Sequence, residues 1–155
     1  RGVRCSSSGQ DALVVERVGG LIELWEGWRL ELPNECMSQR NPDGSWSAWD
    51  ASHTIDVHIV TVTGTGDGEP MDASMMLARA ANASGRGWIG HVEELVEADD
   101  EGPAYLLAIA AAADNTLMSC WVAYRDATGR RWADVVVEAI AFDPDAPGRG
   151  LLGRQ

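Results

Sequence analysis

Residues 105–124 read YLLAIAAAADNTLMSCWVAY and predict two apolar β-strands joined by a tight turn. In the first strand, bulky side chains such as Tyr105 and Leu107 alternate with a face that is mostly alanine. An Asp-Asn pair at residues 114–115 supplies the turn, since both residue types tolerate positive φ angles and bond the nearby backbone. Because both strands carry apolar residues on both faces, we expect them at the centre of a sheet that is covered on both sides.

A helix is expected after this hairpin, from Thr128 as N-cap to Phe142. Three successive valines at residues 135–137 would also suit a strand. At about 100° per residue, however, four charged residues gather within an arc of about 100° while the apolar residues face away, and this favours a helix. Pro144 ends the helix, because proline disfavours helical geometry in the preceding residue. The side chains expected to pack on the hairpin are those of Trp132, Val136 and Ile140.

Shorter apolar runs separated by turn residues predict more antiparallel strands in the first half of the chain. They lie at residues 12–18, 21–25, 28–32, 36–40 and 54–63. Asp72 is expected to cap a helix that runs to about Ala83. Residues 88–97 fit a helix with an apolar arc of about 120°. They also fit a strand, which the resemblance described below favours.

These elements predict an α+β fold in which an antiparallel β-sheet is covered by helices on both faces. The C-terminal helix is expected to pack on the last hairpin. Residues 1–10 are interpreted as a flexible leader, residues 11–143 as a single domain and residues 144–155 as a C-terminal tail. A chain of 155 residues is long enough to bury a core as one domain.

The net charge of −12 argues against binding to nucleic acid or to an anionic membrane surface. It is compatible with a basic protein partner or simply with solubility. No apolar run reaches the ~20 residues that span a bilayer. The chain as given is expected in the cytoplasm, with a secreted or lipid-anchored form left open.

The sequence predicts neither a cofactor nor a bound metal. All twelve basic residues are arginines, so a phosphate-binding or Schiff-base lysine is excluded. Cys36 and Cys120 lie in expected strands and are interpreted as small buried hydrophobes, whereas Cys5 lies in a polar stretch. The sequence contains neither a GxSxG motif nor a CxxC pair. We therefore expect no enzymatic activity, although a carboxylate pair of the glycosidase type cannot be recognised from sequence.

Tryptophans carry the most specific signal for binding, since four of the seven lie between residues 25 and 49. Two of them flank a polar segment beside a strong turn, where an aromatic side chain can anchor a protein partner or stack on a sugar. The same side chains can equally fill a core. The predicted binding residues are Trp46, Trp49, Arg40, Asp50 and His58.

The order of elements resembles the PsbP-like α/β/α sandwich. The resemblance rests on WRLELP at residues 28–33, on the hairpin at residues 105–124, and on the Arg-Trp-Ala triplet at residues 131–133. It covers about two-thirds of the chain as a pattern and carries no functional residue. It implies a non-catalytic binding or accessory role.

We therefore expect a protein-interaction or accessory module, such as an accessory factor, an immunity protein or a chaperone. Its partner would be a protein, possibly a basic one. Three alternatives remain open at this point: a small-molecule or carbohydrate-binding protein, a hydrolase that uses acidic residues, and a structural subunit of an assembly.

Overall fold

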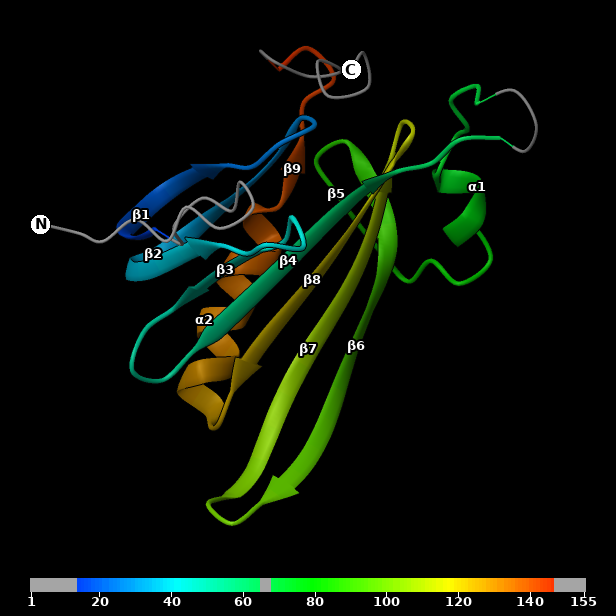
Figure 1. The fold of residues 1–155 in the computed structure, drawn as a ribbon. Helices are drawn as coiled ribbons and strands as arrows, with labels where there is room; N and C mark the ends of the chain where they lie inside the picture. Colours follow the sequence, from blue (N-terminus) through cyan, green and yellow to red (C-terminus); the bar gives the residue numbers. More distant parts are fainter. Residues whose placement is uncertain (1–13, 65–67, 147–155) are drawn as a thin grey trace, which may run out of the picture.

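The computed structural model describes residues 14–64 and 68–146, so the expected leader and most of the expected tail lie outside the described residues. Strands dominate the chain (Figure 1). The elements are β1 (Val15–Glu23), β2 (Trp28–Arg40), β3 (Trp46–Trp49), β4 (Thr54–Thr61), α1 (Ser74–Leu77), β5 (Ala83–Gly85), β6 (Trp88–Asp99), β7 (Gly102–Ala113), β8 (Thr116–Tyr124), α2 (Ala127–Ala139) and β9 (Ala141–Phe142).

The strands form one antiparallel sheet in the order β1-β2-β3-β4-β8-β7-β6-β5, which curls into a half-barrel (Figure 1). The short strand β9 lies at the opening of the curl. It pairs with β2 through Trp28 and Phe142, and Ala141 forms a parallel bridge with Arg86, which lies between β5 and β6. The N–H of Phe142 donates to the carbonyl of Arg86 at 2.9 Å. Strand β9 therefore joins distant parts of the sheet at one end.

The predicted hairpin at residues 105–124 is confirmed. Strands β7 and β8 pair in continuous register from Tyr105 opposite Tyr124 to Ala113 opposite Thr116. Asp114 has a φ of 51° and provides the tight turn that the Asp-Asn pair predicted. Residues 88–97 form a strand, as the resemblance favoured, because β6 pairs with β7 from Ile89 to Asp99.

Helix α2 is confirmed, but its bounds differ from the prediction at both ends. Asp126 is the N-cap, because its Oδ1 atom accepts a hydrogen bond from the N–H of Gly129 at 2.8 Å. The helix ends at Ala139, since Ile140 has an extended backbone with ψ of 127°. The next two residues leave the helix and form β9, where pairing with β2 replaces the helical hydrogen bonds.

The expectation that helices cover both faces of the sheet is wrong. Helix α2 packs against β2 and β8 on the concave, inner face of the sheet, where Trp132, Ala133 and Val136 are buried. The second helix among the described residues, α1, has only four residues instead of the twelve or so expected after Asp72. Its Met75 and Met76 are 71% and 54% exposed, so its apolar side has little surface to pack on and adds little to helix stability.

The hydrophobic core lies between the inner face of the sheet and α2. A chain of two buried hydrogen bonds stabilises the core and connects residues far apart in the sequence. The indole of Trp28 donates to the hydroxyl of Thr116 at 2.9 Å, and that hydroxyl donates to the carbonyl of Ala113 at 2.7 Å. Cys36 and Cys120 are free thiols buried in this core, as predicted.

Candidate functional site

The opposite, convex surface of β4, β8, β7 and β6 is here called the outer face. Side chains alternate along each strand, so every second residue points to this side. No helix lies over the middle of this surface within the part of the chain that the structure describes (Figure 1). The residues of the outer face are Thr54, Asp56, His58, Val60, Leu117, Ser119, Trp121, Ala123, Ala104, Leu106, Ala108, Ala110, Ala112, Ile89, His91, Glu93, Leu95 and Glu97.

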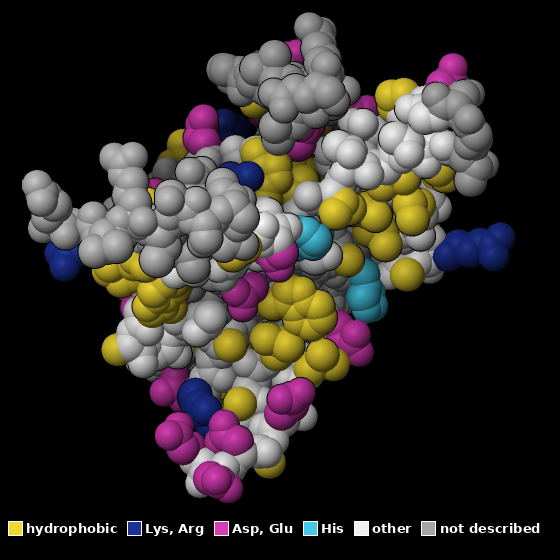
Figure 2. Space-filling model, in the orientation of Figure 1, with side chains coloured by type: hydrophobic (Ala, Val, Ile, Leu, Met, Phe, Trp, Pro, Cys, Tyr) yellow, Lys and Arg dark blue, Asp and Glu magenta, His cyan; other side chains and the backbone are white. Residues whose placement is uncertain are grey.

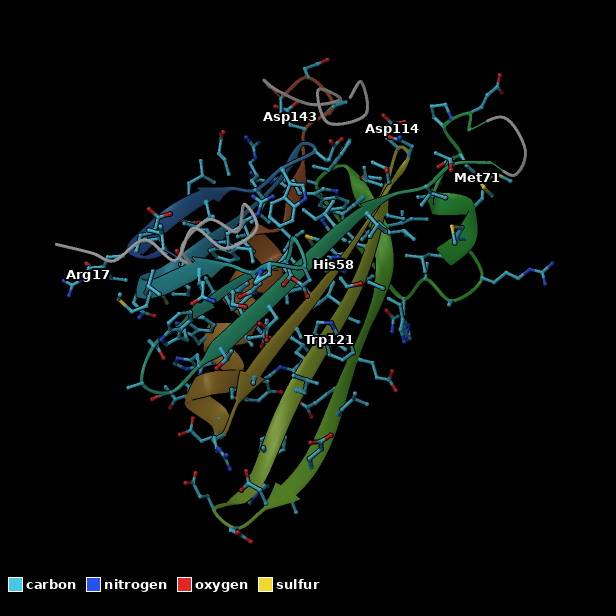
Figure 3. The ribbon with its side chains drawn as sticks, viewed as in Figure 1. Arg17, His58, Met71, Asp114, Trp121 and Asp143 are labelled. Atoms are coloured by element: carbon cyan, nitrogen blue, oxygen red, sulfur yellow. The ribbon has the colours of Figure 1, made fainter. Side chains whose placement is uncertain are left out.

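Trp121 lies at the centre of the outer face and is 42% exposed (Figure 3). The strand register places it beside Asp56 on one side and Ala108 on the other. Leu95 and Val60 are also exposed large apolar residues of this surface. Figure 2 shows apolar side chains gathered around this region, with acidic side chains among and beside them. A large, partly exposed aromatic side chain within an apolar patch is typical of a binding surface.

Alanines of β7 form a stripe of small residues beside Trp121. Ala108 and Ala110 follow one another on the outward side of this strand, between the larger side chains of β8 and β6. Gly90 of β6 and Ala111 of β7 are buried on the inner side. A surface with such short side chains lets a partner approach the sheet closely, which increases the apolar area that contact can bury.

The charge of the outer face is negative. Its carboxylates are those of Asp56, Glu93 and Glu97, and it contains no arginine. Asp56 accepts a hydrogen bond from the hydroxyl of Ser47 at 2.6 Å. Glu93 lies 3.9 Å from Nε2 of His91. The three carboxylates give this surface a negative potential that attracts cations.

The structure disperses the five residues that the sequence predicted as a binding site. Trp46 is buried in the core with 8% exposure, whereas Trp49 lies on the opposite side of the same short strand and is half-buried. The guanidinium of Arg40 lies 4.0 Å from the ring centre of Trp25. Of the five, His58 belongs to the outer face, where Figure 3 shows it on β4, and Trp49 lies on the same side of the sheet in β3, opposite Thr54.

Asp50 belongs to a different cluster, between the β3–β4 loop and α2. Its carboxylate lies 2.9 Å from Nδ1 of His53 and accepts a hydrogen bond from the side-chain amide of Asn34 at 3.0 Å. The imidazole of His53 stacks on Trp132, with ring centres 4.2 Å apart and planes 4° from parallel. The indole N–H of Trp132 donates in turn to the side-chain oxygen of Asn34. The four side chains thus form a closed ring of contacts.

This ring of contacts holds the β3–β4 loop against α2. Burial raises the pKa of Asp50, but hydrogen bonds from His53, Ser52 and Asn34 outweigh it and lower the pKa to about 2. Burial also raises the pKa of the neighbouring Cys36 thiol, with a further contribution from the charge of Asp50, so this thiol is a poor nucleophile at neutral pH. The stacked imidazole is largely covered, with 13% of its side chain exposed.

Within residues 14–64 and 68–146, no three His, Cys, Asp or Glu side chains come together in a way that would hold a metal ion. No helix there is long and apolar enough to cross a membrane. The outer face, with its exposed indole of Trp121 and the exposed apolar side chains of Leu95 and Val60, is the feature of the described chain that most resembles a recognition site.

No protein-family model and no curated protein matches the chain. A protein from Bacteroides thetaiotaomicron VPI-5482, known from a crystal structure at 1.50 Å resolution, has a similar fold with a TM-score of 0.60. The two are 8% identical, and the similarity covers 82% of this chain and 49% of the other. This chain thus spans about half the length of that protein. The similarity shows the fold alone.

Sequence reasoning missed Trp121 as a surface residue. The apolar residues on both faces of its strand predict that both faces are covered. A usable signal was present in the neighbouring positions, since Ser119 shares the outward side of β8 with Trp121 and is polar. Glu93 and Glu97 recur on the same side of β6, which marks that side as solvent-exposed.

Proposed function

We propose that this protein is a non-catalytic protein-interaction module that binds a cationic partner protein on its outer face. The observation that carries the proposal is the exposed indole of Trp121, set in an apolar patch next to the carboxylate of Asp56. Tryptophans in such positions are frequent anchors of protein interfaces, and truncating one can cost about 2 kcal/mol or more of binding free energy.

The charge of the outer face supports a cationic partner. The outer face has three carboxylates and no arginine, and the whole chain has a net charge of −12. A partner with arginine or lysine side chains would be steered to this surface. An arginine could also stack on the exposed ring of Trp121 while it pairs with Asp56. A second copy of the chain would bring like charges together, so the charge pattern disfavours self-association.

Site-specific photo-crosslinking tests this proposal. A photoreactive phenylalanine derivative is placed at position 121, and for comparison at Val135, which is 44% exposed on α2 on the other side of the molecule. In extract of the source organism, position 121 should capture a protein with a positive net charge, and position 135 should not. The captured protein is then identified by mass spectrometry.

The carboxylates provide the matched control. In a chain that carries both Asp56→Asn and Glu93→Gln, capture from position 121 should fall by about tenfold or more, since each lost charge pair in a desolvated interface costs 1 kcal/mol or so. Equal capture from positions 121 and 135 would contradict the proposal. So would an acidic partner, or a second copy of this chain as the main crosslinked product.

A further inference from the structure

Strand β6 has an open edge over its second half. On the side away from β7, strand β5 pairs with β6 only from Trp88 to Gly90. Beyond that point β7 is the sole strand neighbour of β6 among the described residues, and the β6–β7 hairpin projects from the body of the sheet (Figure 1). An open strand edge presents backbone N–H and C=O groups that another strand can pair with.

Asn82 already pairs with this edge through its side chain. Its amide nitrogen donates to the carbonyl of Val92 at 2.9 Å, and its amide oxygen accepts from the N–H of Val92 at 2.8 Å. The side-chain amide of Asn82 thus occupies the place that the backbone of an adjacent strand would take. The main chain of Asn82 also donates to the carbonyl of Gly90 at 2.9 Å.

The geometry of antiparallel strands shows which backbone N–H and C=O groups of β6 point away from β7. Hydrogen-bonding direction alternates along a strand, so the groups of Glu94, Val96 and Ala98 point to the same side as those of Val92. The register with β7 is consistent with this direction. Ala98 lies opposite Pro103, which has no N–H to donate to the carbonyl of Ala98. These three residues form the open edge.

We propose that the open edge binds an extended segment of a cationic protein, which adds to the sheet as a further strand beside β6. Backbone pairing supplies the hydrogen bonds in this mode of recognition, and the flanking side chains supply the specificity. The inference goes beyond the outer-face proposal, because it concerns the backbone edge of β6 that borders the outer face and not the side chains around Trp121.

The side chains beside the open edge define the sequence that would fit. Glu93, Leu95 and Glu97 line its outer side, and Val96 lines the inner side with 60% exposure. An incoming strand would therefore place basic residues opposite the two glutamates and apolar residues opposite Leu95 and Val96. The same glutamates would repel the edge of a second copy of this chain, which limits edge-to-edge aggregation.

The test uses a short synthetic peptide in which lysine recurs at every fourth residue, opposite Glu93 and Glu97, and the residues between the lysines are valines. Amide hydrogen exchange of the full chain is followed by NMR with and without the peptide. The N–H groups of Glu94, Val96 and Ala98 should exchange more slowly when the peptide is present, because they become hydrogen-bonded. A peptide that is N-methylated at the residues opposite Glu94, Val96 and Ala98 cannot donate hydrogen bonds to their carbonyl groups, and it should bind about tenfold or more weakly.

Two variants of the chain separate the backbone from the side chain. Val96→Pro removes an outward N–H without removing a hydrogen bond to β7, so it should abolish peptide binding while the fold is kept. Val96→Ala keeps the N–H and should retain most of the binding. The proposal is overturned if the peptide does not bind, if the N-methylated peptide binds equally well, or if slower exchange appears around Trp121 instead. None of these outcomes affects crosslinking from position 121, so the outer-face proposal is tested separately.

Discussion

The indole N–H of Trp88 donates a hydrogen bond to the main-chain carbonyl of Ile140 at a distance of 2.9 Å. Trp88 is the first residue of β6, and Ile140 is the residue between α2 and β9. Both are buried, with exposures of 5% and 0%. The bond therefore fixes the end of α2 to the sheet at the point where the chain turns into β9.

Replacement of Trp88 by phenylalanine removes the donor and keeps most of the aromatic bulk. We expect Trp88→Phe to lower the free energy of unfolding by about 1–3 kcal/mol, because the buried carbonyl of Ile140 loses this donor. Urea denaturation followed by circular dichroism measures the change. Trp121→Phe, on the outer face, is the matched control and should cost less than about 1 kcal/mol. Equal losses in the two variants would contradict this reading of the bond.

Gly90 allows β6 and β7 to lie in their observed register. A Cβ atom at this position would be 2.1 Å from the carbonyl oxygen of Ala110. We expect Gly90→Ala to destabilise the fold by about 1–3 kcal/mol or more, because the clash is with backbone that cannot move away freely. Gly19→Ala is the control, since its Cβ would meet nothing closer than 3.5 Å. Thermal unfolding compares the two, and a similar melting temperature for both would show that the strands can separate locally at little cost.

Asp50 should make the stability of the fold depend on pH. Its pKa is about 2 in the folded chain, because hydrogen bonds outweigh burial, and about 3.9 when unfolded. The contribution of Asp50 to the free energy of unfolding is therefore complete above about pH 4 and is lost as the pH falls through about 2. Asp50→Asn should lower the free energy of unfolding by up to about 2 kcal/mol at neutral pH and should have little effect near pH 2.

Urea denaturation of both chains across this range measures the effect of Asp50→Asn. Asp100→Asn, at the tip of the β6–β7 hairpin, controls for the loss of one negative charge and should change stability by less than about 0.5 kcal/mol at neutral pH. The contrary result is a difference in the free energy of unfolding between Asp50→Asn and the parent chain that is the same at every pH down to 2. That result would show that the lost hydrogen bonds do not depend on the carboxylate charge.

Two tryptophans test the division of the molecule into core and outer face. Trp46→Ala should cost about 3–5 kcal/mol of stability because its side chain is buried. Trp121→Ala should cost much less because 42% of that residue is exposed, and its main effect should fall on capture of the partner. Denaturation curves and the crosslinking assay give the two readouts. A folded, stable Trp46→Ala variant would restore Trp46 as a candidate binding residue.

Local sequence signals predicted several elements correctly. Alternation and the turn at residues 114–115 predicted the β7–β8 hairpin, because both signals depend on neighbours along the chain. The clustering of charges predicted α2 for the same reason. Its last residues were misassigned, since helical periodicity continues through Ile140 although pairing with β2 draws Ala141 and Phe142 into a strand.

The arrangement of layers could not be predicted in this way. Apolar residues on both faces of β7 and β8 indicate which surfaces avoid water, but they do not identify what covers them. Ala108 and Ala110 suit a partner protein as well as a helix of the same chain. The stacking of His53 on Trp132 likewise depends on two residues that are far apart in sequence and meet only in the folded chain.

Strand β9 also affects how the chain folds during translation. Trp28 opposite Phe142, and Arg86 beside Ala141, are contacts between early, middle and late parts of the chain. During translation β2 must wait for these late residues to leave the ribosome before its pairing is complete. Contacts of such long range slow folding. The edge of β2 at Trp28 and Arg29 therefore stays without its β9 partner until residues 141 and 142 have been made.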